Sequence, residues 1–483
     1  MTGMRVERLD HLGIVAGVCQ EIGLAAYLDA LSGPSQQQVS VGTATVAMIL
    51  NGLGFSNRRL YLVSQFFATK PVEHLLGPGI TAEMLHDDCL GRTLDWLYDH
   101  DPTALFAGIA RQARQRFGVS ARQVHVDTTS FFVSGEYAAA EAATEGADAD
   151  AHTIAVTYGY SRDHRADLKQ WMLALATTRQ GDVPLFCRAL DGNASDKASL
   201  LAAVEALAEQ LRPAEPPEAE DAGGADAQTP IFVADSGLYS AHNVAQLNGA
   251  GVRWISRAPE TSTAAQTALD VADDAWQQDP QDPQDPAGTR WWVAVAQPPA
   301  GERWLVVRTA QGEERARATL TRKFAQVRAQ WEKRLWHLGH QRFACAPDAQ
   351  TALAAQLKTC PAWLVVQAEV QAVSKHARPG RPRNDAVPDH LEWQVQATLT
   401  VDAAAVTRQV RRNAAFLVAT NVLDPVALSD HELVQTYSEQ HSVERGFAFL
   451  KDPLFLASSV FVKKPERIVA LSLVMVLCLL IYR

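Results

Sequence analysis

A change in hydrophobic pattern at Arg122 most constrains how this chain can fold. From this residue on, short apolar runs of strand length appear, first at residues 123–127 and later at residues 231–235. Between them, residues 198–211 place five apolar side chains on one face of a helix. Strands that then alternate with helices predict an α/β fold, built on a central mixed sheet with flanking helices.

The rest of the chain is organised around this core. With 483 residues, it is too long for one hydrophobic core, so several domains are expected. Residues 1–115 have apolar residues at helical spacing, which predicts an N-terminal helical domain. Residues 263–404 hold eight of the eleven tryptophans, and we interpret them as a β-rich inserted domain. The insertion would divide the core into residues 116–262 and residues 405–483.

The same patterns predict individual elements. A long helix is predicted at residues 313–338, inside the insertion, and a shorter helix at residues 237–247. Further strands are predicted at residues 153–160, 173–178, 184–190, 252–256, 291–295, 304–309, 360–370, 390–401 and 414–420.

The charge balance first argues against a nucleic-acid partner. The net charge is −10, and DNA binding requires cations that neutralise phosphates. However, residues 136–150, 214–226 and 270–285 hold 16 of the 54 acidic residues and no Lys or Arg. These three segments lack the apolar content of a core, so we expect flexible surface inserts. Without them, 44 basic residues stand against 38 acidic ones, and the charge no longer excludes DNA.

Cysteines and apolar stretches suggest a protein without disulfides or membrane spans. No two of the six cysteines have metal-ligand spacing, so we expect reduced thiols. The most apolar stretch, residues 468–482, is shorter than the roughly 20 residues that cross a bilayer. A buried core helix is the preferred interpretation, and a membrane-tethered binding module is an alternative.

Two of the predicted strands end in a carboxylate, at Asp127 and Asp235. A side chain at a strand end is held rigidly at the edge of the sheet, where α/β proteins gather catalytic groups. Such an aspartate is more often a turn residue or a helix cap, so a two-metal site needs a third acid. His125 lies on the same face of its strand as Asp127, and we interpret it as structural.

The third acid comes from a predicted helix at residues 432–451. Tyr437, Gln440, Glu444 and Lys451 follow at spacings that place them on one face of a single helix. The neighbouring apolar side chains would pack this helix against the sheet. Taken alone, this pattern also fits an ordinary solvated helix.

At these residues the chain resembles the DDE insertion-sequence transposases. In one branch of that family, the catalytic Glu lies in a Tyr, two residues, Arg, three residues, Glu, six residues, Lys signature, and Tyr437, Gln440, Glu444 and Lys451 have that spacing. The resemblance spans nearly the whole chain and includes residues 124–130, 159–163, 167–170, 191–196, 233–237 and 420–421. Gln440 replaces the signature Arg, which in the family contacts phosphate together with the Tyr. Glutamine has no charge and cannot form the bidentate contact of arginine.

The resemblance implies a ribonuclease H-like core with a β-rich insertion before the catalytic Glu. Asp127, Asp235 and Glu444 would hold two Mg²⁺ ions about 3.5–4 Å apart, and Mn²⁺ can substitute. The implied reactions are phosphodiester hydrolysis and strand transfer. Lys451 would contact phosphate near the cut, and the helical domain is a candidate for binding DNA ends.

Cations in three places are candidate DNA contacts. Residues 303–342 hold ten Lys or Arg against three Glu, with Trp331 and Trp336 interleaved, although a charged helix with buried tryptophans fits equally. A Gly-Arg-Pro core flanked by arginines resembles the AT-hook, which enters the A·T minor groove, although a flexible basic loop also fits. The candidate residues are Arg322, Lys323, Arg328, Arg378, Arg381, Arg383, Lys463 and Lys464.

The sequence therefore predicts a transposase that cuts at terminal inverted repeats and inserts its element into target DNA. We expect a homodimer in the complex with double-stranded DNA, no membrane association, and a cytoplasmic, nucleoid-associated location. A truncated or inactive transposase-derived DNA-binding protein is the alternative, because the sequence stops inside an apolar helix.

Overall fold

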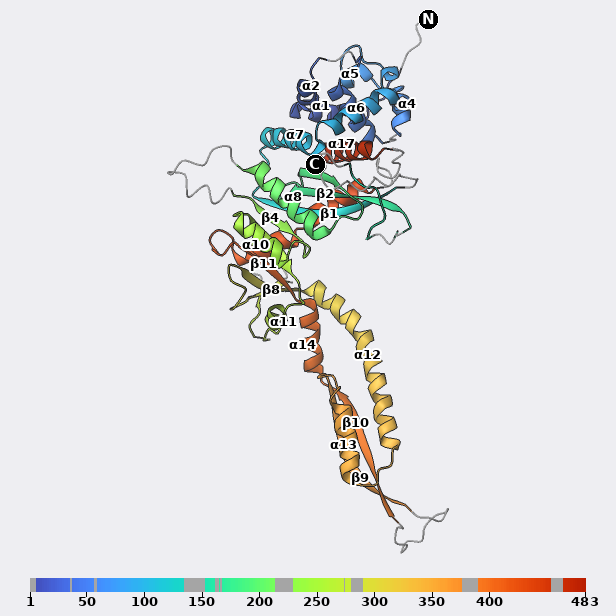
Figure 1. Cartoon of the computed structure of the whole chain (residues 1–483), viewed down its shortest axis with the longest axis vertical. Helices are drawn as coiled ribbons and strands as arrows, with labels where there is room; N and C mark the ends of the chain where they lie inside the picture. The colour runs from blue at the N-terminus through green and yellow to red at the C-terminus, as the bar shows by residue number, and fades with distance from the viewer. Residues whose placement is uncertain are drawn as a thin grey trace, which may run out of the picture. The chain divides into compact units, whose positions relative to one another are not determined.

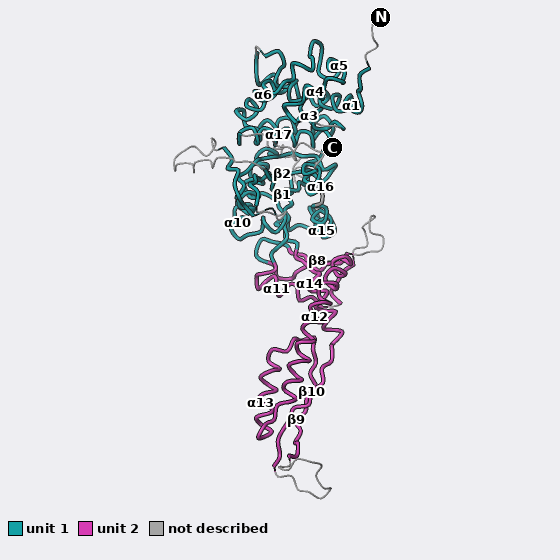
Figure 2. The backbone as a smooth tube through the Cα atoms, turned by 90° about the vertical axis from the view of Figure 1, so that its right-hand side faces the viewer, with its two compact units in different colours: residues 1–259, 299–303, 418–483 teal, residues 260–298, 304–417 magenta. Residues whose placement is uncertain are grey.

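A computed structural model describes most of the chain. The described residues are 6–34, 37–55, 59–133, 153–160, 165, 167–212, 229–272, 274–278, 290–375, 390–452 and 464–483. The chain has two compact units: unit 1 is Met1–Pro259, Pro299–Arg303 and Val418–Arg483, and unit 2 is Glu260–Pro298 and Trp304–Leu417 (Figure 2). The four domains proposed from the sequence remain a prediction.

The N-terminal part of unit 1 is helical. Its helices are α1 (Leu12–Ile22), α2 (Leu24–Ser32), α3 (Val41–Gly52), α4 (Val63–Phe67), α5 (Val72–Leu76), α6 (Asp87–Asp99) and α7 (Pro102–Phe117), with 3₁₀ turns at Leu60–Leu62 and Ala82–Met84. Asp29 fixes the start of α3, because its carboxylate accepts hydrogen bonds from the Gly42 amide at 2.7 Å and the Ser40 hydroxyl at 2.8 Å. A Cβ on Gly42 would lie 2.3 Å from the Ala25 carbonyl oxygen, so α2 and α3 approach closely only with glycine there.

Helix α17 (Pro465–Tyr482) packs among these helices, against α3, α6 and α7 (Figure 1). Its Arg467 donates to both carboxylate oxygens of Asp95 on α6, at 2.6 and 2.7 Å. Within the described residues, α17 is long and apolar enough to cross a membrane, and the bent pair α1–α2 also qualifies if taken as one span. However, 72% of α17 is buried inside the protein, as expected for a core helix.

The centre of unit 1 is a mixed sheet. Its strands are β1 (Gln123–Val133), β2 (Lys169–Thr178), β3 (Pro184–Leu190), β4 (Ile231–Ala234), β5 (Arg253–Ala258) and β11 (Phe416–Thr420), in the order β3-β2-β1-β4-β5-β11. Strands β1, β2 and β3 pair antiparallel, whereas β4 is parallel to both β1 and β5. The α/β fold with a mixed sheet and flanking helices is therefore confirmed.

Besides α7 and α17, which both contact β3, further helices pack on this sheet. Helix α8 (Asp196–Leu211) contacts β1, β2 and β3, and α10 (Ala241–Gly249) contacts β5. Helix α15 (Asp430–Ser438) packs on β4 and β5, and α16 (His441–Leu450) packs on β1 and β2. The last two helices bring the C-terminal part of the chain over the centre of the sheet.

The strand predicted at residues 153–160 is wrong. Only Thr157 forms a bridge, exchanging backbone hydrogen bonds with Gln170 at 3.1 and 2.9 Å. The Ala155 backbone instead bonds to a loop, because its amide donates to the Asp191 carboxylate at 2.7 Å and its carbonyl accepts from the Gly192 amide at 2.9 Å. This loop satisfies backbone groups that a neighbouring strand would otherwise pair.

Unit 2 contains three antiparallel strands that belong to the nine-stranded sheet, one long helix with shorter ones, and a separate two-stranded hairpin. Strands β6 (Gln277–Gln278), β7 (Arg290–Ala294) and β8 (Arg303–Thr309) pair in sequence, and β9 (Leu364–Lys375) pairs with β10 (His390–Val401). The helices are α11 (Thr263–Ala268), α12 (Ala310–His340), α13 (Ala346–Leu357) and α14 (Ala403–Ala414). The predicted inserts at residues 136–150 and 214–226 lie outside the described residues, as do residues 273 and 279–285 of the third predicted insert, whereas its residues 277–278 form β6.

Candidate active site

The register of β1 and β4 places two of the predicted acids side by side. His125 pairs with Val233 in the parallel ladder, so Asp127 and Asp235 each lie two positions further along neighbouring strands. Parallel strands are about 4.8 Å apart and equivalent positions face the same side, so both carboxylates lie on one side of the sheet. However, β1 continues to Val133, so Asp127 lies within its strand and the prediction of a strand end is wrong there. The strand continues because β2 pairs with it along its whole length beyond Asp127.

Short hydrogen bonds orient both aspartates. The Thr128 amide donates to Asp127 Oδ1 at 2.7 Å, and the Gly237 amide donates to Asp235 Oδ1 at 2.8 Å. The Ser256 hydroxyl on β5 donates to the Asp235 carbonyl at 2.7 Å. A Cβ on Gly237 would lie 2.8 Å from Asp235 Oδ1, so the turn after β4 requires glycine to keep this bond.

The third acid is on a helix that the sequence analysis joined incorrectly to its neighbour. Residues 432–451 do not form one helix: α15 ends at Ser438 and α16 begins at His441. The Ser438 hydroxyl donates back to the Val434 carbonyl at 2.8 Å, a contact that often bends helices. Glu439 pairs with Arg179 outside the helix, so a long-range ion pair holds the junction.

The signature residues are therefore spread over two helices rather than one face. Tyr437 lies on α15, Gln440 precedes α16, Glu444 is exposed in the first turn of α16, and Lys451 follows its last residue. The Lys451 ammonium lies 5.9 Å from the ring centre of Phe131 on β1. Lys451 thus lies against the strand that also carries Asp127.

The electrostatics of Tyr437 connect Asp235 with Glu444. Burial raises the pKa of Tyr437 to about 12, Arg257 opposes this shift, and the carboxylates of Asp235 and Glu444 add to it. Both carboxylates therefore act on the same hydroxyl. Tyr437 is on α15, which packs against β4 and β5. Asp235 directly follows β4, and Arg257 lies on β5.

Arg257 is the residue of this site that sequence analysis missed. It follows Ser256, which is aligned with Ala234, so Arg257 is level with Asp235 on the neighbouring strand. The signal was present in the sequence, because the predicted strand at residues 252–256 is followed directly by this cation. The positive charge of Arg257 acts on Tyr437. Gln440, which stands at the arginine position of the signature, has no charge.

His125 is buried below this region. Its side chain is 1% exposed, and neither ring nitrogen has a hydrogen-bond partner among the described residues. Burial lowers the pKa of His125 to about 4, Arg179 and Arg445 lower it further, and Asp182 opposes them. A neutral, buried imidazole agrees with the structural role expected from the sequence.

The chemistry of the donor set fits hard divalent cations. Asp127, Asp235 and Glu444 offer carboxylate oxygens, the ligands that Mg²⁺ prefers. The carboxylate oxygens of these three acids do not all lie within 4.8 Å of one another. In the described part of the chain, the one group of three potential metal ligands that meets this distance is His86, Asp87 and Asp88, which are exposed. The ligands of a two-ion site surround both metals rather than one point, so they need not all lie within 4.8 Å of one another.

The candidate DNA contacts of α12 are on the surface of unit 2. Arg322, Lys323 and Arg328 are exposed, and Arg328 donates to Glu332 at 2.8 Å. Trp331 is buried at 3% exposure, so the prediction of two interleaved tryptophans at the surface is wrong for it. Trp331 packs with Leu335 and Trp363 in a small core, which leaves Trp336 exposed at 59%.

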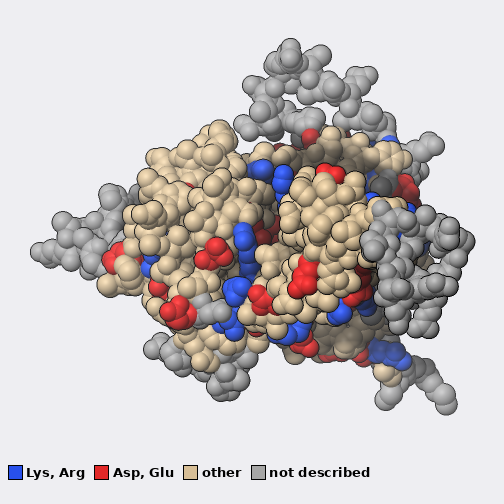
Figure 3. Space-filling model, turned by 90° about the horizontal axis from the view of Figure 1, so that it is seen from below, with Lys and Arg blue, Asp and Glu red and all other residues tan. Residues whose placement is uncertain are grey.

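The remaining candidate cations are only partly described. Lys464 is exposed at the start of α17. On the face drawn in Figure 3, Lys and Arg side chains form several small groups with Asp and Glu between them. Arg378, Arg381, Arg383 and Lys463 lie outside the described residues.

Comparison with known proteins identifies the class. Residues 141–481 match the family described as "Transposase DDE domain", and residues 4–111 match a "Domain of unknown function (DUF4277)". The first match covers more than half of the chain, begins after Asp127, and includes Asp235 and Glu444. The chain therefore belongs to the transposases with a DDE domain, a class of enzymes that cut DNA and join its strands.

The similarity to a solved transposase structure is low in sequence identity. A solved structure described as "Cryo-EM structure of piggyBac transposase synaptic complex with hairpin DNA (SNHP)" is similar at 11% identity, with a TM-score of 0.26. The similarity covers 64% of this chain and 54% of that one, so the chain spans about half the length of that transposase. No curated protein matches the sequence.

Proposed function

We propose that this protein catalyses metal-dependent cleavage and strand transfer at the ends of an insertion sequence, on a ribonuclease H-like core. The observation that carries the proposal is the register of β1 and β4, in which His125 pairs with Val233, and Asp127 and Asp235 each follow two positions later. Glu444 would extend this set, because α16 packs on β1, the strand of Asp127, and its charge also acts on the Tyr437 hydroxyl together with that of Asp235. Three carboxylates gathered in this way are the ligand set that a two-metal phosphoryl transfer requires.

Each residue of the site would have a separate role in catalysis. Two Mg²⁺ ions, or Mn²⁺ in their place, held by Asp127, Asp235 and Glu444 would activate the attacking water or 3′-hydroxyl and stabilise the leaving oxygen. The Tyr437 hydroxyl is protonated at neutral pH, and burial raises its pKa further, to about 12, so it can donate a hydrogen bond to a phosphate oxygen. Lys451 would contact phosphate near the cut.

Arg257 would supply charge that the signature lacks. Gln440 stands where the related enzymes have an arginine, and its amide can donate a hydrogen bond without neutralising phosphate. Arg257 is level with Asp235 and acts on Tyr437 from the neighbouring strand. We therefore assign phosphate anchoring at this site to Arg257 and Tyr437, with Gln440 as a neutral donor.

The wider DNA interface follows from exposed cations. Arg322, Lys323 and Arg328 on α12 would track phosphates, and Lys464 would add a contact in unit 1. Arg378, Arg381 and Arg383 would enter an A·T minor groove, with Lys463 beside Lys464. We propose that residues 1–115 bind the terminal inverted repeats and that a homodimer holds two ends with the target DNA. The expected location is the cytoplasm, on the nucleoid.

The test is cleavage of a DNA duplex that carries the ends of the element. The wild-type protein should cut it with Mg²⁺ or Mn²⁺ and lose activity when the metal is chelated. Asp127→Ala, Asp235→Ala and Glu444→Ala should each reduce cleavage to background while DNA affinity without metal is kept. Full activity in any of these variants would contradict the assignment. DNA binding by the wild type without cleavage in either metal would favour the inactive DNA-binding alternative.

A further inference from the structure

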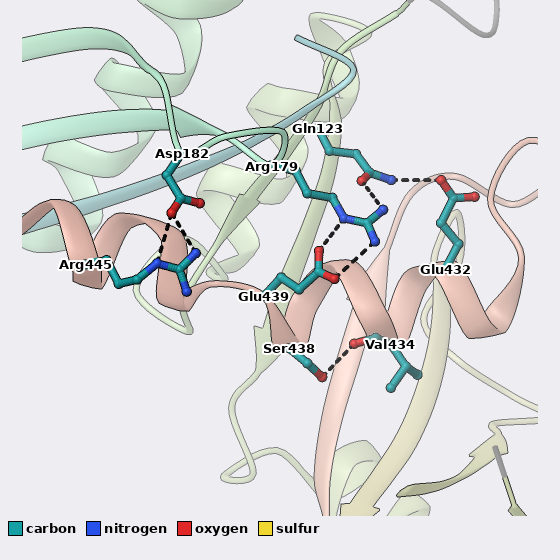
Figure 4. A network of polar contacts seen from close by, with 8 residues as sticks. All are labelled: Gln123, Arg179, Asp182, Glu432, Val434, Ser438, Glu439 and Arg445. Atoms are coloured by element: carbon teal, nitrogen blue, oxygen red, sulfur yellow. Dashed lines mark hydrogen bonds and ion pairs between the residues drawn. The ribbon is translucent and has the colours of Figure 1, made fainter. Parts of the chain in front are cut away.

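The turn between β2 and β3 contacts α16, the helix of Glu444, and also the junction that precedes this helix (Figure 4). From the turn, Arg179 pairs with Glu439 and Asp182 pairs with Arg445. Glu439 is at the junction of α15 and α16, five positions before Glu444, and Arg445 is the next residue after it. The two ion pairs therefore lie on either side of Glu444 in the sequence.

The first pair fixes the helix junction to the sheet. Arg179 uses Nε and Nη2 on the two carboxylate oxygens of Glu439, with the Nη2 bond at 3.1 Å. Its third donor, Nη1, reaches Gln123 Oε1 on β1 at 2.8 Å. Gln123 in turn donates to Glu432 on α15 at 2.8 Å. Helix α15 and the junction that follows it are thus both tied to the strand that carries Asp127.

The second pair holds α16 just beyond Glu444. Arg445 donates from Nε and Nη2 to Asp182 Oδ2 at 2.9 and 2.7 Å. The Asp182 side chain is only 11% exposed, and Arg483 lies 3.6 Å from the same oxygen. A buried carboxylate is costly to leave without a partner, so the turn strongly favours a bound arginine.

The two pairs have opposite polarity, which restricts the rotation of α16. The turn supplies a cation, Arg179, to the junction carboxylate, and an anion, Asp182, to Arg445 on the helix. The Glu439 pair fixes the point from which α16 starts, so a rotation of α16 about its axis would separate Arg445 from Asp182. The opposite face of α16 is apolar, with Val443, Phe447 and Leu450 buried. Apolar contacts tolerate small rotations, whereas paired, hydrogen-bonded charges are directional.

We propose that the β2–β3 turn, residues 179–183, is a positioning element that sets the rotation of α16 and so aims Glu444 toward Asp127 and Asp235. This inference rests on the proposed metal-dependent function. Arg179, Asp182, Glu439 and Arg445 act through Glu444 and are positioning residues rather than catalytic ones. Residues that orient a metal ligand commonly change metal affinity or activity by about 10- to 100-fold when they are removed.

Glu439→Gln and Arg445→Ala test the proposal. Glu439→Gln keeps the size of the side chain and removes its charge, and Arg445→Ala leaves Arg483 near the buried Asp182. We expect each variant to raise the Mg²⁺ concentration for half-maximal cleavage by about 10- to 100-fold. DNA affinity without metal and the thermal unfolding midpoint should stay close to wild type. Mn²⁺ binding, followed by electron paramagnetic resonance, should weaken in parallel without relying on activity.

Matched variants separate positioning from general stabilisation. Arg212→Ala removes an exposed ion pair with Glu209 on α8, at 3.0 Å, and should leave the Mg²⁺ requirement unchanged. Arg445→Lys keeps the charge and should recover part of the metal affinity. In a double-mutant cycle, Arg179→Ala should add little to Glu439→Ala, because both remove the same pair.

The outcomes distinguish this proposal from the proposed function. If the wild type cleaves DNA with metal and Glu444→Ala does not, an unchanged metal requirement in both Glu439→Gln and Arg445→Ala overturns the positioning role alone. If the wild type neither cleaves nor binds Mn²⁺, both proposals fail. If Arg445→Ala lowers the unfolding midpoint, Glu439→Gln with intact folding decides the question.

Discussion

The two units differ in how their interiors are built. In unit 1, a large cluster of buried side chains runs from the N-terminal helices through β2 to α16 and α17. The described residues of unit 2 form small clusters, one around Trp331 and Trp363 and another around Leu338 and Val395. A continuous core can hold carboxylates in fixed positions, as a metal site requires. Small cores support long elements with much exposed surface, which suits contacts to an extended polymer.

The largest expected effect is on the core of unit 1. Leu477 on α17 is 0% exposed, so Leu477→Ala should lower the free energy of unfolding by about 2–5 kcal/mol. Urea unfolding with hydrogen exchange read out by mass spectrometry would locate the loss. Exchange should increase across α3, α6 and α17 and stay unchanged in unit 2. The matched variant Leu335→Ala should have the reverse distribution, and equal effects in both units would contradict separate cores.

A smaller effect is expected where two helices of unit 1 touch. Gly42→Ala would force a Cβ to 2.3 Å from the Ala25 carbonyl oxygen, so overpacking should cost about 1–3 kcal/mol of unfolding free energy. The control is Gly339→Ala in α12, whose Cβ would lie 3.3 Å from the Val395 carbonyl oxygen. There the gain in helix propensity, about 1 kcal/mol, offsets the crowding. Equal destabilisation by the two substitutions would show that the helices of unit 2 are packed as closely as those of unit 1.

Still smaller stability effects are expected on the surface of unit 2. The Arg328–Glu332 pair is about half exposed on both sides, so Arg328→Ala should change the unfolding free energy by less than about 1 kcal/mol. Its effect should appear in DNA binding, where the slope of log K against log salt should become shallower by about 0.9. Arg212→Ala should change neither quantity. An unchanged salt slope in Arg328→Ala would remove this residue from the interface.

The last prediction changes no residue. Cys345 and Cys360 in unit 2 are half-buried, whereas Cys19, Cys89, Cys187 and Cys478 in unit 1 are buried. Burial also raises the pKa of Cys19 to about 12, so little of it is the reactive thiolate at neutral pH. A maleimide should therefore label the two thiols of unit 2 in the native protein and the other four only after unfolding. Peptide mapping checks this, and rapid native labelling of Cys187 or Cys478 would contradict a closed core in unit 1.

Elements whose ends are set by nearby residues could be predicted from the sequence. The helix predicted at residues 313–338 is found as Ala310–His340, and it begins where Thr309 accepts a hydrogen bond from the Gly312 amide at 3.0 Å. The strands predicted at residues 291–295 and 304–309 are present and pair antiparallel. Periodicity and local capping contain enough information for such segments.

Features set by distant residues could not be predicted. The helix at residues 432–451 is divided because Glu439 pairs with Arg179, 260 positions away. Arg257 joins the candidate site through the register of β5 on β4, which the composition of neither strand reveals. The three acids could be proposed from the sequence because each follows or lies in a recognisable strand or helix, and their role as ligands stays a prediction. The sequence thus indicated the candidate ligands, and the residues that orient them required the structure.

The packing of α17 also has a consequence for how the protein is made. The helices up to Phe117 and the helix that begins at Pro465 share one core, although these residues are 348 positions apart, 465 minus 117. At about 5–20 residues per second, a ribosome needs roughly 20–70 s to synthesise the intervening chain. During that time the N-terminal helices expose the apolar surface that α17 later covers. Nascent copies should therefore depend on chaperones for longer than their size alone would suggest, until α17 emerges from the ribosome and covers this surface.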